Sequence, residues 1–200
     1  MTLNEVLKNT NYDVSLFSDE TRKYIEDAIV IKTVRGKDTP HITCLKRGKE
    51  IVLKPDEAVR QLYLYKLIHE YGYPTSRIEV EFPIHFGREV KRADIVIIDK
   101  DRPMVPYIIV ELKKPKLSDG KEQLKSYCNA TGAPIGVWTN GEQISYYNRK
   151  DPNYFEPITN IPKVTEKLSD IINEKFTYED LKKIDRISQQ KRSLRSLIQE

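Results

Sequence analysis

The clearest pattern of hydrophobic and polar positions lies near the middle of the chain. Two short runs of mostly β-branched residues, 94–98 and 107–112, are separated by a polar segment that contains Pro103 and Pro106. Short β-branched runs bounded by turn residues are typical of buried strands. The pattern therefore predicts a β-hairpin at the centre of the fold.

The same kind of pattern predicts the elements around this hairpin. Helical spacing indicates a helix that begins at Pro55 and runs to about Tyr71, before Gly72 and Pro74. The other expected elements are a strand over 77–86, a helix from Ser118 or Asp119 to Ala130, and strands over 134–139 and 143–147 joined at Asn140-Gly141. This order predicts an α/β fold with a mixed central β-sheet flanked by helices.

The register of the central hairpin brings two acids together. If its loop closes between Asp99 and Pro106, Asp94 lies directly opposite Glu111, and Lys113 points to the same face as Glu111. Opposed carboxylates are destabilising, and burying one without a partner costs several kcal/mol, so a cation is expected between them. Two carboxylates, with water and a phosphate, suit Mg²⁺, and a nearby ammonium can hold the attacking water. The cluster predicts a metal-dependent phosphodiesterase.

Two polar residues on the following helix could reach the same cluster. Gln123 and Tyr127 are four residues apart, so they share one face of the helix. Gln123 could orient water or a base edge, and Tyr127 could bond a phosphate or Lys113. Four lysines nearby could track a phosphate backbone, although a solubilising helix surface explains each one singly as well: Lys114, Lys116, Lys121 and Lys125.

Three further acids precede the hairpin. Glu57 lies at the head of a helical stripe that turns partly inward, although an acid in the first turn also complements the helix dipole. Glu79 and Glu81 lie on one side of the expected strand 77–86, where solvated edge charges are the simpler interpretation. Only Glu57 is kept as a candidate site residue.

Asp94, then Glu111-Leu112-Lys113, then Gln123 and Tyr127 resemble the pattern of the PD-(D/E)xK nucleases, in the variant with an added Gln-x-x-x-Tyr. The segments EAVRQLYLYKLIHEYGYP, RADIV, VELKKP and TNG make the chain most similar to the N-terminal nuclease domain of the restriction (R) subunit of type I restriction-modification enzymes. The resemblance covers roughly residues 55–147. One departure is that the first acid follows Ala93 and not proline.

This resemblance implies a restriction-endonuclease-like fold and a DNA endonuclease that hydrolyses phosphodiester bonds with Mg²⁺, for which Mn²⁺ could substitute. Asp94, Glu111 and the backbone carbonyl of Leu112 would hold the metal, Lys113 would orient the nucleophile, and Gln123 and Tyr127 would assist. Glu57 would be an auxiliary member of the site. The implied partners are double-stranded DNA and motor, methyltransferase or specificity modules outside this chain.

The composition of the chain narrows the possible classes of protein but does not choose among them. The chain has 32% charged and 38% hydrophobic residues, a net charge of +4 and a pI near 8.8, which permit nucleic-acid binding. It has no apolar run that could span a membrane and no signal peptide, so we expect a cytoplasmic protein. Cys44 and Cys128 form no C-x-x-C, and without a P-loop motif the chain has no ATP site.

The expected organisation has three parts. Residues 1–54 form an N-terminal accessory segment, with a helix over 19–30 and a hairpin over 41–54 that has Gly48 in its turn. Residues 55–150 form the nuclease core, and residues 151–200 form a polar linker and C-terminal helices that lead to a domain absent from this chain. Two alternatives stay open, namely a RecB-like repair nuclease and a catalytically silent domain for DNA binding or subunit docking.

Overall fold

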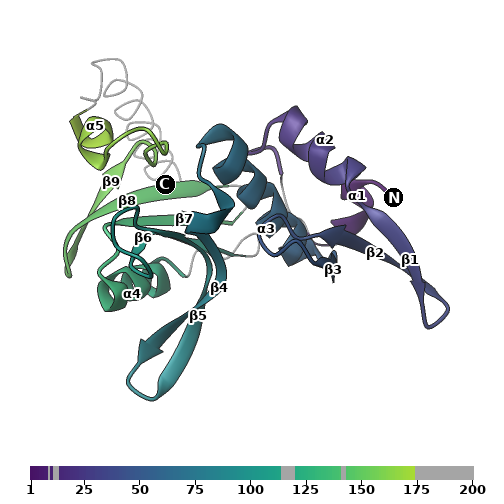
Figure 1. Cartoon of the computed structure of the whole chain (residues 1–200), viewed down its shortest axis with the longest axis horizontal. Coiled ribbons are helices and arrows are strands. Elements are labelled where there is room, and N and C mark those ends of the chain that lie inside the picture. The colour runs from purple at the N-terminus through teal and green to yellow at the C-terminus, as the bar shows by residue number, and fades with distance from the viewer. Residues whose placement is uncertain (9, 11–13, 114–119, 141–142, 174–200) are drawn as a thin grey trace, which may run out of the picture.

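The centre of the molecule is a six-stranded mixed sheet with the strand order β4-β5-β6-β7-β8-β9 (Figure 1). Its strands are β4 (Ile78–Phe86), β5 (Glu89–Ile98), β6 (Pro106–Leu112), β7 (Ile135–Thr139), β8 (Ile144–Asp151) and β9 (Tyr154–Ile158). Strands β6 and β7 are parallel, and all other neighbours in this sheet are antiparallel. The computed structural model describes the whole chain except residues 9, 11–13, 114–119, 141–142 and 174–200.

Two helices cover opposite faces of this sheet. Helix α3 (Pro55–Tyr65) continues into a π-helical turn (Lys66–Glu70) and shares a buried cluster with Ile95 and Ile97. Helix α4 (Lys121–Thr131) packs on the other face, where Leu124 lies in a cluster with Val96. Because successive residues of a strand point to opposite faces, β5 contributes to both clusters. The predicted mixed α/β fold with flanking helices is confirmed.

The register of the central hairpin is also as predicted. Strands β5 and β6 pair Ile95 with Val110, Val96 with Ile109 and Ile97 with Ile108. Continued by one residue, this register places Asp94 opposite Glu111. The pairing shifts by one residue between Ile97 and Ile98, beside the loop, and does not alter the site end of the ladder.

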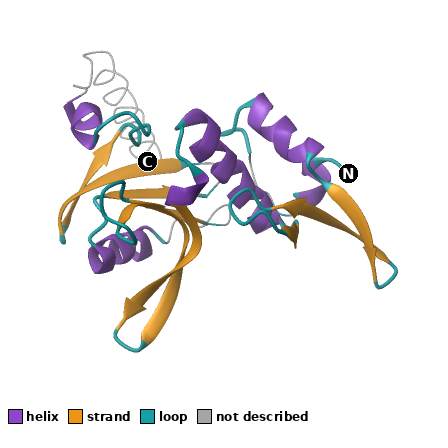
Figure 2. Cartoon of the chain, in the orientation of Figure 1, coloured by secondary structure: helices purple, strands orange, loops and turns teal. Residues whose placement is uncertain are grey.

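The N-terminal elements pack against α3. They are α1 (Leu3–Val6), α2 (Asp19–Asp27) and an antiparallel sheet of β1 (Val30–Val34), β2 (Lys37–Thr43) and β3 (Glu50–Val52), shown in Figure 2. Leu3, Phe17, Ile25 and Ile42 belong to the same hydrophobic cluster as α3. The expected hairpin is present with Gly48 at a φ of 61°, and β1 extends it by a strand that the sequence pattern did not predict.

The structure also changes two predictions about where elements lie and begin. Residues 154–158, expected within a linker, form β9 and pair with β8. A turn-initiating Asp151, whose Oδ1 accepts a hydrogen bond from the backbone N–H of Asn153 at 2.8 Å, makes this hairpin possible. Helix α4 begins at Lys121 with Gly120 as its N-cap, while the expected caps Ser118 and Asp119 lie outside the described residues.

The expected C-terminal helices fall largely outside the described part of the chain. Helix α5 (Leu168–Asn173) is the last element that the structure describes. Across the described residues, no helix is both long enough and apolar enough to cross a membrane.

Candidate active site

Asp94 lies in β5 next to Ile95, where the pairing of β5 with β6 ends and β5 continues paired with β4 alone. Its Oδ2 accepts a hydrogen bond from the backbone N–H of Leu112 at 2.8 Å, which fixes the carboxylate against β6. Its Oδ1 accepts a second hydrogen bond from Nη2 of Arg60 at 3.1 Å. The carboxylate is therefore oriented by both neighbouring elements, β6 and α3.

Glu111 is the buried acid of the cluster, with a side chain that is 3% exposed. Its Oε1 lies 2.7 Å from Nζ of Lys113, whereas its Oε2 is buried without a hydrogen-bond partner among the described residues. Burial, and then the nearby charge of Asp94, raise the pKa of Glu111 to about 7, against the opposing effects of Lys113 and Arg60. An unpartnered, buried carboxylate oxygen is a group that a cation would stabilise.

Lys113 links the acid pair to helix α4. Its Nζ donates a hydrogen bond to Oε1 of Gln123 at 2.9 Å, and Nε2 of Gln123 donates in turn to the hydroxyl of Tyr127. Burial lowers the pKa of Lys113, but its hydrogen bond and ion pair with Glu111 outweigh this and raise it above the usual value. Lys113 is therefore an ammonium near neutral pH, a donor and not a general base.

Glu57 joins the cluster through an arginine that sequence reasoning did not select. Nη1 of Arg60 lies 2.8 Å from Oε2 of Glu57 and 3.7 Å from Oε1 of Glu81. The other carboxylate oxygen of Glu57 accepts a hydrogen bond from Nε2 of Gln61 at 2.7 Å. Arg60 follows Glu57 by three residues, so helical spacing from the candidate acid was the signal that could have found it.

The four lysines that the sequence suggested as DNA contacts differ in their surroundings. Lys125 pairs with Glu122 at 2.7 Å, and Nζ of Lys121 lies 4.8 Å from the centre of the Trp138 ring. Lys114 and Lys116 lie outside the described residues. The two described lysines thus have partners within the protein, and their role toward DNA stays a prediction.

A groove lies beside Gln123 and Tyr127 and is lined by two cationic residues, Lys91 and Arg92, that the sequence did not suggest. Its volume is about 620 Å³. It is lined by Phe86, Glu89, Lys91, Arg92, Gln123, Ser126 and Tyr127. One wall is thus the β4–β5 hairpin and the other is α4, and the groove is joined to the acid cluster through Gln123, which accepts the hydrogen bond from Lys113.

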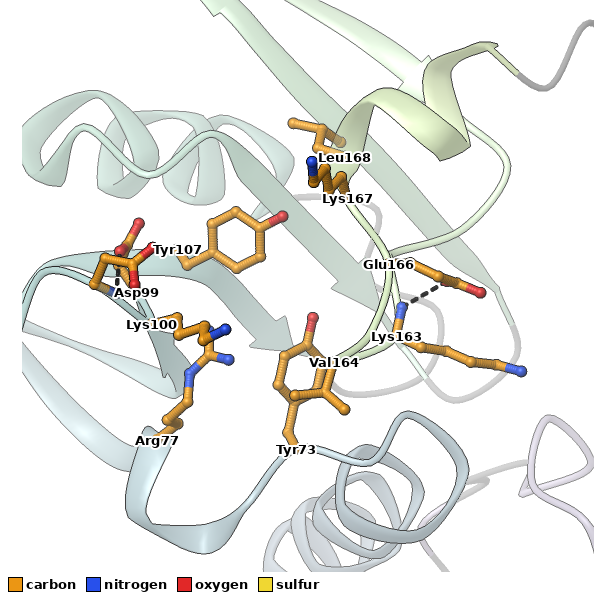
Figure 3. A pocket seen from close by; sticks show the side chains of 11 residues that line it. Tyr73, Arg77, Asp99, Lys100, Tyr107, Lys163, Val164, Glu166, Lys167 and Leu168 are labelled. Carbon is orange, nitrogen blue, oxygen red and sulfur yellow. Dashed lines mark hydrogen bonds between the residues drawn. The ribbon is translucent and has the colours of Figure 1, made fainter.

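A smaller pocket of about 200 Å³ lies away from these groups (Figure 3). It is lined by the β5–β6 loop, by Tyr73, Arg77 and Tyr107, and by residues 163, 164 and 166–168. Asp99 in that loop and Asp94 lie at opposite ends of the β5–β6 ladder. None of the candidate site residues lines this pocket.

The residues present fit one divalent cation at the acid pair. Among the residues that the structure describes, no three His, Cys, Asp or Glu side chains are gathered as a metal site. Asp94 and Glu111 nevertheless supply two carboxylates on adjacent strands, and Oε2 of Glu111 has no other described partner. Oxygen donors of this kind are those that Mg²⁺ and Mn²⁺ prefer.

The model of one protein family matches residues 55–162, more than half of the chain, and the family is described as the type I restriction enzyme R protein N terminus. No curated protein matched the sequence. Among solved structures, the chain is similar to a protein of a family of unknown function from Anabaena variabilis ATCC 29413, provisionally described as a nuclease. That similarity has a TM-score of 0.39 and 16% identity, and covers 90% of this chain and 97% of the other.

Proposed function

Because the chain belongs to the family of type I restriction enzyme R protein N-terminal domains, we propose that it is the DNA endonuclease domain of such an enzyme. The single observation that carries the proposal is the pair of half-buried Asp94 and buried Glu111, with Lys113 beside it and one oxygen of Glu111 left unpartnered among the described residues. A phosphodiester in double-stranded DNA is the proposed substrate. Motor, methyltransferase and specificity modules are its proposed partners.

In this proposal Asp94, Glu111 and the carbonyl of Leu112 hold Mg²⁺, with Mn²⁺ as a substitute. The ion supplies Lewis-acid polarisation of the phosphate and lowers the pKa of the attacking water. The described hydrogen bonds of Asp94 to Leu112 and Arg60 keep its carboxylate in place before substrate arrives. Preorganised groups of this kind need not be rearranged during the reaction.

Lys113 and its neighbours complete the proposed chemistry. An ammonium has three N–H donors, and those of Lys113 reach Glu111 and Gln123 and leave one for the attacking water or the scissile phosphate. Gln123 holds the ammonium in place and also bonds Tyr127. Tyr127 and Gln123 border the groove, so they would meet the phosphate backbone.

Calorimetric titration of Mn²⁺ tests the proposal without requiring the partner modules. Wild type should bind the ion, whereas folded Asp94→Asn and Glu111→Ala variants should not. Glu79→Gln is the matched control, because Glu79 is an acid of β4 that pairs with Lys46, 3.1 Å away, and touches no group of the acid pair. If wild type binds no metal even with duplex DNA present, the silent docking domain is the better description.

A further inference from the structure

The side chain of Arg60 is placed among three acids from three different elements. Its guanidinium lies 2.8 Å from Glu57 of α3, 3.7 Å from Glu81 of β4 and 3.1 Å from Asp94 of β5. The side chain is only 14% exposed, and its Nε is buried without a hydrogen-bond partner among the described residues. A buried guanidinium is costly unless it is paired, so these acids are what stabilise it there.

The backbone of Glu81 supports a specific role for this arrangement. Glu81 has a φ of 52° in the middle of β4, a conformation that side chains other than glycine rarely adopt. It lies between Val80 and Phe82, whose partners Ile95 and Ala93 flank Asp94. Backbone strain of this kind costs about 1–3 kcal/mol and persists where surrounding contacts fix it. Here it accompanies a carboxylate that is directed toward Arg60.

The charges around the site leave room for one divalent cation. The cluster contains four carboxylates and three cationic side chains: Glu57, Glu81, Asp94 and Glu111, and Arg47, Arg60 and Lys113. One negative charge remains, which one divalent ion would change to one positive charge and a second ion would raise to three positive charges. A second would leave a large positive charge in a partly buried place, which is unfavourable.

We propose that Arg60 is a built-in cation that makes this a one-metal centre. Its guanidinium fills the space between Glu57, Glu81 and Asp94 in which a second divalent ion would otherwise be held. One ion is then left to Asp94 and Glu111. Arg60 is a positioning residue, since it acts through Asp94, and the inference rests on the metal-dependent function proposed above.

The number of Mn²⁺ ions bound per chain, counted by calorimetry and by the electron paramagnetic resonance signal of free Mn²⁺, tests the inference. Wild type and Arg60→Lys should bind one ion. Arg60→Gln should bind two, because Glu57, Glu81 and Asp94 then lose the cation that they share. Arg60→Met is the second variant if the glutamine protein does not fold. Arg47→Gln is the matched control, because it removes the same charge from a guanidinium that pairs with Glu81 at 2.9 Å but does not fill the space among the three acids, so the count should stay at one.

The outcomes separate this inference from the proposed function. Two ions on wild type, or one ion on both folded neutral variants of Arg60, would overturn the one-metal assignment while leaving the metal-dependent function intact. No ion on wild type would remove both. A double variant, Arg60→Gln with Glu57→Gln, should return the count to one, which shows that the second ion occupies the place of the guanidinium.

Discussion

At the scale of single residues, burial of Glu111 makes the metal-free protein sensitive to pH. The pKa of this carboxyl is raised from 4.5 to about 7 in the folded protein. Between these values the folded state binds more protons than the unfolded state, so stability falls as pH rises. Urea unfolding in the presence of a chelator should show this effect as a loss of about 2–3 kcal/mol between pH 5 and pH 8.

The variant Glu111→Gln isolates this contribution, because its side chain is neutral at every pH. Its stability relative to wild type should increase across the same interval, and added Mn²⁺ should stabilise wild type alone. The affinity of wild type for Mn²⁺ should weaken as pH falls below about 7, because the ligand must lose its proton. Parallel stability curves for the two proteins would show that Glu111 is not the titrating group.

The sequence could predict the positions of those residues that follow from local patterns along a strand or a helix. Period-two alternation and the hairpin register placed Asp94, Glu111 and Lys113 together, and the i,i+4 spacing placed Gln123 and Tyr127 on one helix face. The positive φ of Glu81 follows from no pattern of alternation. Its role, like that of Arg60, depends on how α3, β4 and β5 meet, which the sequence order of the elements does not determine.

At the scale of elements, the N-terminus of α4 sets the position of Lys113. Gly120, the N-cap, has a φ of 98°, and a Cβ atom there would lie 2.3 Å from Cε of Lys113. The sequence suggested a side-chain cap before α4, because Ser and Asp are common N-caps. A glycine at this position instead lets the lysine stem pass close to the helix, which only the packed structure reveals.

Gly120→Ala should therefore slow catalysis much more than Gly132→Ala does. The added methyl group would displace Lys113 from Glu111 and Gln123, and small misplacements of catalytic groups can cost about 10²-fold in rate. Gly132→Ala is the matched control, because the φ of Gly132 is 77° and a Cβ atom there would lie 4.0 Å from its nearest neighbour, Nη2 of Arg149. Both variants should lose similar stability in thermal unfolding, by about 1–3 kcal/mol. Equal Mn²⁺-dependent cleavage rates of the two would contradict this role of Gly120.

At the scale of the whole molecule, the β4–β5 hairpin projects beyond the body of the central sheet (Figure 1). Lys91 and Arg92 lie on this hairpin and line the groove that α4 closes on its other side. The N-terminal elements pack against α3, away from the tip of the hairpin. The groove thus lies next to Gln123, the hydrogen-bond partner of Lys113, and has cationic side chains on the wall that faces α4.

If this groove holds the backbone of the substrate, Lys91 and Arg92 contact phosphates and release counterions when DNA binds. Each contact to duplex DNA contributes about 0.9 to the slope of the logarithm of the binding constant against the logarithm of salt concentration. The double variant Lys91→Ala/Arg92→Ala should therefore lower the magnitude of this slope by about 1.8 in fluorescence-anisotropy titrations without divalent metal. Arg22→Ala/Lys23→Ala removes the same charge from α2 and should leave the slope unchanged. Equal slopes for the two double variants would mean that Lys91 and Arg92 do not contact phosphates. Loss of net charge alone would then explain any change in affinity, and DNA would reach Asp94 and Glu111 from another side.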